Sequence, residues 1–126
     1  MKTEIRIDEK LGEIGGLYCH AVKAGEYIFS TQIGNVEGGE LAGPGMYEQT
    51  VQTMRNIGYV LEHAGAGYDD IVKCTIYITD MNDYDEMNRA YAEFMNKPYP
   101  ARACVQVSRL SPGSKVEMEF TIYTGN

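Results

Sequence analysis

Three residues near the end of the chain could act on a small carboxylic acid. Arg102 lies among small neighbours, and a guanidinium with room around it binds a carboxylate through two parallel hydrogen bonds. Glu117 and Glu119 alternate along an extended run, where an apolar wall or a second carboxylate would raise a carboxyl pKa and suit a general base for water. Other interpretations stay open: Arg102 could pair with Glu119, and the two glutamates could form a solvated strand edge.

Cys104 is a further candidate, but a nucleophilic thiol needs a histidine or a cation to form the thiolate. Arg102 is the only visible partner, since His20 and His63 fall on other elements, and a packed strand thiol is the alternative. The two histidines and three cysteines form no recognisable metal motif. The glycines of residues 34–45 lack the Lys-Ser or Lys-Thr of a phosphate-binding loop. The sequence therefore predicts no metal site.

The elements that position these residues begin with a hairpin and a helix. Short extended runs on both sides of Ala24-Gly25 predict a β-hairpin over residues 18–32. Residues 34–45 hold five glycines and one proline, which indicates a loop and a candidate pocket rim. Apolar residues then recur at spacings of three and four until Gly65, which predicts an amphipathic helix with a glycine C-cap: Val51, Met54, Ile57, Leu61 and Ala64.

Three strands and a second helix follow. Residues 71–79 alternate, with Val72, Cys74, Ile76 and Ile78 expected on one face. Asp83 and Glu86 resemble a capping box, and the helix that they begin is expected to end near Asn96, before two prolines. Residues 101–108 and 116–123 return to alternation, which places Arg102 and Cys104 on one face of their strand.

The order ββαβαββ predicts an α+β fold in which two helices cover one face of a mixed, two-layer β-sheet. At 126 residues and without a linker or a repeat, the chain is expected to form a single domain over residues 1–126. The uncovered face would carry Tyr, Cys, Thr, Gln and Arg side chains, Arg102 and Cys104 among them. Such a half-polar face suits burial against another subunit.

Charge and composition exclude several classes of protein. The formal charge of −7 and the pI of about 4.7 oppose general binding to a phosphate backbone, so we expect no nucleic-acid partner. No apolar run of 18 or more residues and no secretory signal occur, so we expect a cytoplasmic protein without a membrane partner. Three widely separated cysteines are expected to be free thiols.

Several segments together carry a resemblance to a known family. They are Ile14-Gly15-Gly16-Leu17-Tyr18, Phe29-Ser30-Thr31-Gln32-Ile33, Asp80-Met81-Asn82-Asp83-Tyr84 with Asn88 beyond it, Pro100-Ala101-Arg102-Ala103-Cys104-Val105, and Lys115-Val116-Glu117-Met118-Glu119. In this order and spacing the chain resembles the RidA/YjgF family of enamine and imine deaminases over nearly its whole length. The resemblance implies a chorismate-mutase-like fold and a homotrimer with sites in clefts between subunits.

The resemblance also implies the reaction and the residue roles. It implies hydrolysis of 2-enamino and 2-imino acids, such as 2-aminoacrylate, 2-iminopropanoate and 2-iminobutanoate, to 2-keto acids and ammonia, without metal or organic cofactor. Arg102 would hold the substrate carboxylate and Glu117 would activate water. The positions implied to line the substrate pocket are Tyr18, Ser30, Thr31, Asn88 and Cys104.

Departures from the family pattern keep two other functions open. Leu17 stands where the family commonly has proline, Thr31 where it has glycine, and Ala103 where it has serine, so the shape of the pocket is expected to differ. One alternative is a trimer that binds a small ligand or regulates without catalysis. The other is an endoribonuclease-type translation inhibitor, against which the negative charge weighs.

Overall fold

The computed structural model describes residues 1–125, which form one six-stranded sheet in the order β1-β2-β3-β6-β4-β5. The strands are β1 (Lys2–Ile5), β2 (Ala21–Ala24), β3 (Tyr27–Ile33), β4 (Ile71–Ile78), β5 (Ala101–Gln106) and β6 (Val116–Tyr123). The helices are α1 (Asp8–Leu11), α2 (Met46–His63) and α3 (Tyr84–Ala92), with short 3-10 turns η1 (Tyr68–Asp70) and η2 (Met81–Asp83).

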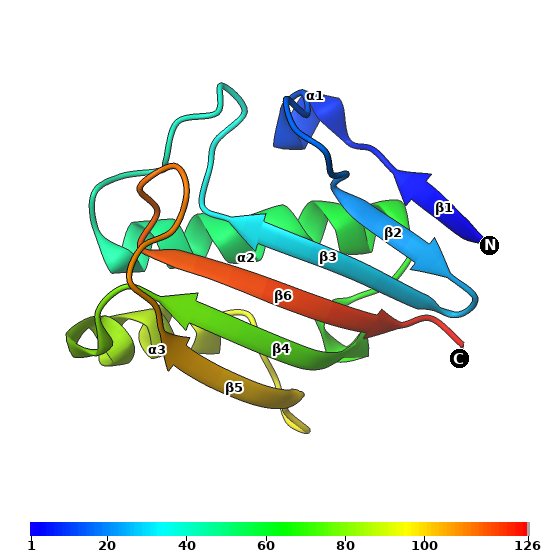
Figure 1. Cartoon of the computed structure of the whole chain (residues 1–126). Coiled ribbons are helices and arrows are strands. Elements are labelled where there is room, and N and C mark those ends of the chain that lie inside the picture. The colour runs from blue at the N-terminus through cyan, green and yellow to red at the C-terminus, as the bar shows by residue number, and fades with distance from the viewer. Residues whose placement is uncertain (126) are drawn as a thin grey trace.

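The connections make this a mixed sheet. Strand β5 pairs in parallel with β4, and every other pair of neighbours in the sheet is antiparallel. A parallel pair needs a crossover, and α3 provides it between β4 and β5. Figure 1 shows α2 and α3 behind the same face of the sheet, with β1 and β5 at its two edges. We call the face covered by α2 and α3 the inner face, and the opposite one the outer face.

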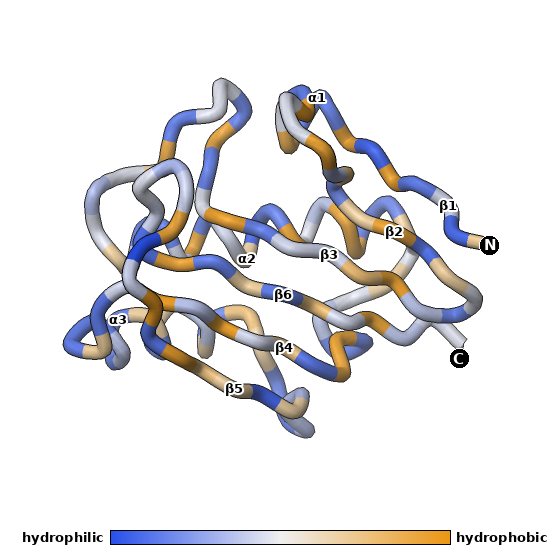
Figure 2. Tube along the Cα trace, viewed as in Figure 1, coloured by the Kyte–Doolittle hydropathy of each residue, from blue (hydrophilic) through white to orange (hydrophobic). Residues whose placement is uncertain are grey.

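The predicted α+β architecture is confirmed, and the alternation of side chains explains it. Hydrophobic and hydrophilic residues alternate along β4 and β6 (Figure 2). In β6 the inner-face residues are all buried, and they pack with the apolar face of α2 in one core: Val116, Met118, Phe120 and Ile122. Burying one face of each strand under the helices is what fixes the register of the sheet.

The predicted first helix is confirmed at both ends. It begins at Met46, after Pro44-Gly45, and its last helical residue is His63. Gly65 follows in the left-handed region at φ 69°, and the Ala66 N–H donates to the Leu61 carbonyl at 2.9 Å, which is the glycine-terminated C-cap that the sequence indicates. The hairpin is also confirmed, with Gly25 at φ 61° in its turn.

Three local expectations are wrong. Val72 is 44% exposed because a β-bulge between Ile71 and Lys73 shifts it off the core face. Asp83 does not cap α3 with its side chain; instead Asp80 accepts a hydrogen bond from the Asn82 N–H at the start of η2. Helix α3 ends at Ala92 rather than near Asn96.

The expected orientation of β5 is also wrong. Arg102 and Cys104 pair with Cys74 and Ile76 of β4, both of which are fully buried, so all four side chains lie on the inner face. The exposed outer-face positions of β5 are Ala101, Ala103 and Val105. The outer face therefore carries threonine, tyrosine and glutamate side chains, but neither Arg102 nor Cys104. The sequence analysis also did not anticipate β1 and α1, which add an edge strand and one helical turn.

Candidate active site

Arg102 lies between strand β5 and helix α3, in a setting made almost entirely by that helix. Its Nη1 donates to Oδ1 of Asn88 at 2.7 Å, and its Nη2 donates to the hydroxyl of Tyr84 at 2.9 Å. Its Cζ lies 5.0 Å from the centre of the Tyr91 ring, which adds a cation–π contact. Arg102 therefore does not pair with Glu119, the alternative that the sequence left open.

The two cysteines near Arg102 are thiols rather than thiolates. Burial raises the pKa of Cys74 to about 12, and burial also raises the pKa of Cys104, while Arg102 lowers both to a smaller extent. A raised pKa suppresses the nucleophilic form, since only the thiolate attacks. Cys104 therefore packs beside Arg102 without the properties of a nucleophile, and the three cysteines of the chain are free.

Glu117 lies on the outer face, and its surroundings suit a base. Its pKa is raised above the ordinary glutamate value, first by burial and then by the negative charge of Glu119. The hydroxyl of Tyr77 donates to Glu119 through a short hydrogen bond. Thr31 stands directly opposite Glu119 in the β3–β6 register, so Thr31, Tyr77 and the two glutamates form one polar group. This group has the charge and burial to hold a water and take its proton.

Ser30 is buried, and its hydroxyl is already engaged. It donates to the His20 carbonyl at 2.6 Å and receives a hydrogen bond from Nε2 of Gln32 at 2.8 Å. His20 in turn accepts from the Ile7 N–H at Nδ1 and contacts the Gly12 carbonyl through Nε2, both at 2.9 Å. Within one chain, the Ser30 hydroxyl thus holds the segment that follows Tyr18.

Tyr18 and Leu17 project from the loop between α1 and β2. Tyr18 is 68% exposed and Leu17 is fully exposed. Neither the Tyr18 ring nor the Leu17 isobutyl group packs against the core of the chain. This loop therefore presents apolar surface.

The predicted site residues therefore fall into separate groups in one chain. The structure brings Arg102, Asn88 and Cys104 together on the inner face, and it brings Thr31 and Glu117 together on the outer face. Strand β4 separates β5 from β6, which puts the two backbones about 10 Å apart. Sequence analysis missed Tyr84 as a partner of Arg102, because its place on an apolar helical stripe indicated only packing.

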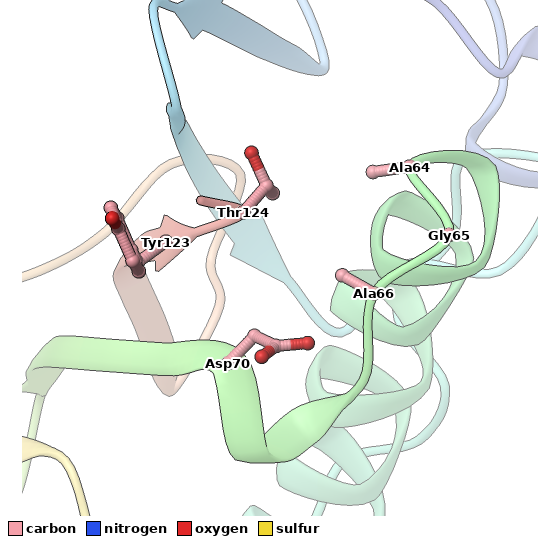
Figure 3. A pocket seen from close by; sticks show the side chains of 6 residues that line it. All are labelled: Ala64, Gly65, Ala66, Asp70, Tyr123 and Thr124. Carbon is pink, nitrogen blue, oxygen red and sulfur yellow. The ribbon is translucent and has the colours of Figure 1, made fainter. Parts of the chain in front are cut away.

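Two shallow hollows indent the surface. One of about 180 Å³ lies on the outer face beside the glutamate group, lined by Phe29, Ser30, Thr31, Lys73, Thr75, Glu119, Phe120 and Thr121. Figure 3 shows the other, of about 100 Å³, between the loop after α2 and the end of β6. Its only charged lining residue is Asp70, and none of the predicted site residues lines it.

Residues 1–125 show neither a metal-binding cluster nor a membrane-spanning helix. Among these residues, no group of three or more His, Cys, Asp or Glu side chains is arranged to hold a metal ion. None of their helices combines the length and the apolar character needed to cross a bilayer.

Comparison with known proteins identifies the class to which this fold and these side chains belong. The family model described as Endoribonuclease L-PSP matches residues 12–124. A RutC family protein of Pyrococcus abyssi is 40% identical over 125 residues, covering 98% of each chain. The human protein named 2-iminobutanoate/2-iminopropanoate deaminase is 35% identical over 112 residues, covering 87% of this chain and 82% of its own.

Solved structures agree with the sequence comparison. The crystal structure of RidA from the Antarctic bacterium Psychrobacter sp. PAMC 21119 superposes with a TM-score of 0.89 at 36% identity, covering 96% of this chain and 98% of its own. The protein thus has the RidA fold and belongs to the RidA/YjgF family.

Proposed function

We propose that this protein hydrolyses reactive 2-imino and 2-enamino acids to 2-keto acids and ammonia. The observation that carries the proposal is Arg102, whose guanidinium is half-buried and forms no ion pair with a carboxylate among residues 1–125. A half-buried cation without an anionic partner suits an incoming carboxylate. The name of the human relative, 2-iminobutanoate/2-iminopropanoate deaminase, supports the same substrate class.

In this mechanism Arg102 binds the substrate carboxylate and fixes the position of the neighbouring imine carbon. Burial and the charge of Glu119 raise the pKa of Glu117, which makes its carboxylate a stronger base. This carboxylate takes a proton from water as the water oxygen forms a bond to the imine carbon. Glu117 then passes this proton to the imine nitrogen, which gives a tetrahedral carbinolamine with one hydroxyl and one amino group. In the collapse Glu117 takes the hydroxyl proton and donates it to the amino group, the carbon–nitrogen bond breaks, and the 2-keto acid and ammonia leave with Glu117 ionised again.

The reaction as proposed needs more than one copy of the chain. Arg102 and Glu117 lie on opposite faces of the same sheet, so one small substrate cannot reach both within one copy. A homotrimer with its sites between subunits would bring the inner-face group of one copy near the outer-face group of another. The exposed Tyr18 loop would then contact a neighbouring subunit.

The test is hydrolysis of 2-aminoacrylate and 2-aminocrotonate, generated in place by a serine/threonine dehydratase and followed by semicarbazide trapping. We expect Arg102→Ala to lower kcat/KM about 100-fold, as for the loss of a charged hydrogen-bond pair. Glu117→Gln is expected to lower kcat with little change in KM. The matched controls are Arg55→Ala and Glu62→Gln, both at exposed positions of α2.

The outcome separates this function from its alternatives. Unchanged hydrolysis in Arg102→Ala would contradict the mechanism. If wild type binds 2-keto acids in calorimetry without accelerating imine decay, a ligand-binding role replaces the enzyme. The description of the family model names an endoribonuclease. That function would be favoured if RNA cleavage survived rigorous purification and was lost when a single site residue was substituted.

A further inference from the structure

In the part of the chain that the structure describes, helix α3 supplies both side-chain hydrogen bonds of Arg102. Tyr84, Asn88 and Tyr91 stand at positions i, i+4 and i+7, so their side chains form one stripe on the helix that faces β5. Asn88 contacts Nη1, Tyr84 contacts Nη2, and the Tyr91 ring lies beside the guanidinium. The two terminal nitrogens are thus held at separate points on one rigid element.

A guanidinium has five N–H donors, and these contacts occupy two of them. Three N–H groups remain, which is enough for a carboxylate bound by two parallel hydrogen bonds. An arginine loses considerable rotamer freedom when it is fixed, and that loss opposes ligand binding unless the protein has already fixed the side chain. Holding both nitrogens before substrate arrives removes this cost.

We propose that Tyr84 is a positioning residue that acts through Arg102 and sets the affinity of the site for a carboxylate. The inference rests on the proposed function, in which Arg102 binds the substrate carboxylate. Asn88 has the same role through its amide oxygen, which accepts a hydrogen bond from Nη1 of Arg102. Tyr84 adds a hydroxyl acceptor that no other side chain among residues 1–125 provides to Nη2.

The hydroxyl of Tyr84 has little to do with the stability of α3. The helix is anchored by buried side chains on the same stripe and beside it, namely Met87, Ala90 and Tyr91. Among residues 1–125, the only hydrogen bond of the Tyr84 side chain is the one that its hydroxyl accepts from Arg102. Replacing Tyr84 by phenylalanine therefore keeps the ring and the helix and removes one acceptor from the guanidinium.

The experiment compares wild type with Tyr84→Phe, using calorimetry with 2-oxobutanoate and with its uncharged amide, 2-oxobutanamide. We expect Tyr84→Phe to weaken 2-oxobutanoate binding about fivefold and to leave binding of the amide unchanged. In imine hydrolysis, KM is expected to rise by the same factor while kcat stays within about twofold. Tyr47→Phe is the matched control, since its hydroxyl bonds to Glu93 on the surface and should change neither ligand's affinity.

Each result decides between the inference and its alternatives. Equal affinity of wild type and Tyr84→Phe for 2-oxobutanoate would overturn the positioning role, whether or not imines are hydrolysed. Equal weakening of acid and amide would also overturn it, because general damage to the pocket does not depend on charge. Wild type that binds the acid but hydrolyses no imine would refute the proposed function alone, while a selective loss in Tyr84→Phe would still support the clamp on Arg102.

Discussion

At the scale of single residues, Arg102 and Glu117 are prepared for chemistry in different ways. Arg102 is prepared by geometry, because the hydrogen bonds that it donates to Tyr84 and Asn88 orient its guanidinium. Glu117 is prepared by its electrostatic surroundings, because burial and then the charge of Glu119 disfavour its ionised form. The first arrangement favours binding of an anion, and the second makes the ionised Glu117 carboxylate a stronger base than an ordinary glutamate.

The raised pKa of Glu117 predicts the pH dependence of hydrolysis. A general base acts only when ionised, so kcat/KM should fall as pH drops through the pKa of Glu117, at a higher pH than an ordinary glutamate would give. Glu119→Gln removes the second cause of the shift, and we expect it to move this acid limb to lower pH. The measurement is the pH profile of catalysed minus uncatalysed imine decay. A limb unmoved by Glu119→Gln would exclude Glu117 as the group that titrates.

The Tyr91 hydroxyl predicts a change in stability. It is buried without a hydrogen-bond partner among the described residues, and burial raises its pKa to about 12. Removing a buried polar atom that has no partner removes its desolvation cost, so Tyr91→Phe should raise the free energy of unfolding by about 1 kcal/mol in urea denaturation. Tyr68→Phe is the control of opposite sign, since the Tyr68 hydroxyl donates to the Met54 carbonyl at 2.8 Å. Destabilisation by Tyr91→Phe would show that the hydroxyl has a partner in solution.

At the scale of elements, helix α2 holds the end of β3 and the loop beyond it. Asn56 on α2 donates to the carbonyls of Ile33 and Asn35 at 2.8 and 2.9 Å. Gln49, one turn from the start of the helix, donates to the Gly43 carbonyl and accepts from the Lys115 N–H. The buried side-chain amides of Asn56 and Gln49 therefore fix the end of β3 and the start of β6. These contacts in turn fix the spacing of Thr31 and Glu117.

Gly34 tests this contact between elements. A Cβ added there would lie 2.2 Å from the Gln49 carbonyl oxygen, a backbone atom that cannot move without displacing α2. We expect Gly34→Ala to lower the free energy of unfolding by about 3 kcal/mol, measured by urea denaturation. Gly15→Ala is the control, because nothing lies within 4 Å of its added Cβ. Equal stabilities of the two variants would contradict the close packing of β3 on α2.

At the scale of the whole molecule, the outer face of the sheet is left without a covering layer in one chain. Tyr27 stacks on Phe29 and contacts Tyr123, and the first two of these rings are 43% and 47% exposed. Val105 on β5 is exposed on the same face. An apolar face of this kind next to the glutamate group suits the subunit contact that the proposed trimer needs.

Phe29→Glu tests that contact. The side chain is exposed in one chain, so the substitution should leave the circular dichroism spectrum unchanged, whereas a charge in a subunit interface should disfavour assembly. We expect light scattering to show a trimer for wild type at micromolar concentration, and smaller species with proportionally lower hydrolysis for Phe29→Glu. Arg55→Glu, on the exposed side of α2, is the control. A wild-type monomer that hydrolyses imines would contradict a site between subunits.

The sequence by itself determined most of the elements, β1 and α1 excepted, because local periodicity and local turn chemistry are enough to specify them. Alternation in residues 116–123, the apolar stripe that ends at Gly65 and the turn at Gly25 all predicted what the structure has. The sequence also showed that Arg102 and Glu117 are residues of types that can bind an anion and take a proton. The motifs around them indicated the family that the comparisons confirm.

The tertiary structure alone decided which side chains meet. Alternation says that Arg102 and Cys104 share a face, but not which face, since that depends on the parallel pairing of β5 with β4 across α3. The bulge at Val72 likewise depends on the pairing of β4 with β6, a strand distant in sequence. The cap at Asp80 depends on a local hydrogen bond, from the Asn82 N–H, that competes with capping by Asp83. Arg102 meets Tyr84 and Asn88 only because α3 packs over that inner face, and this contact orients the guanidinium for the carboxylate binding that we propose.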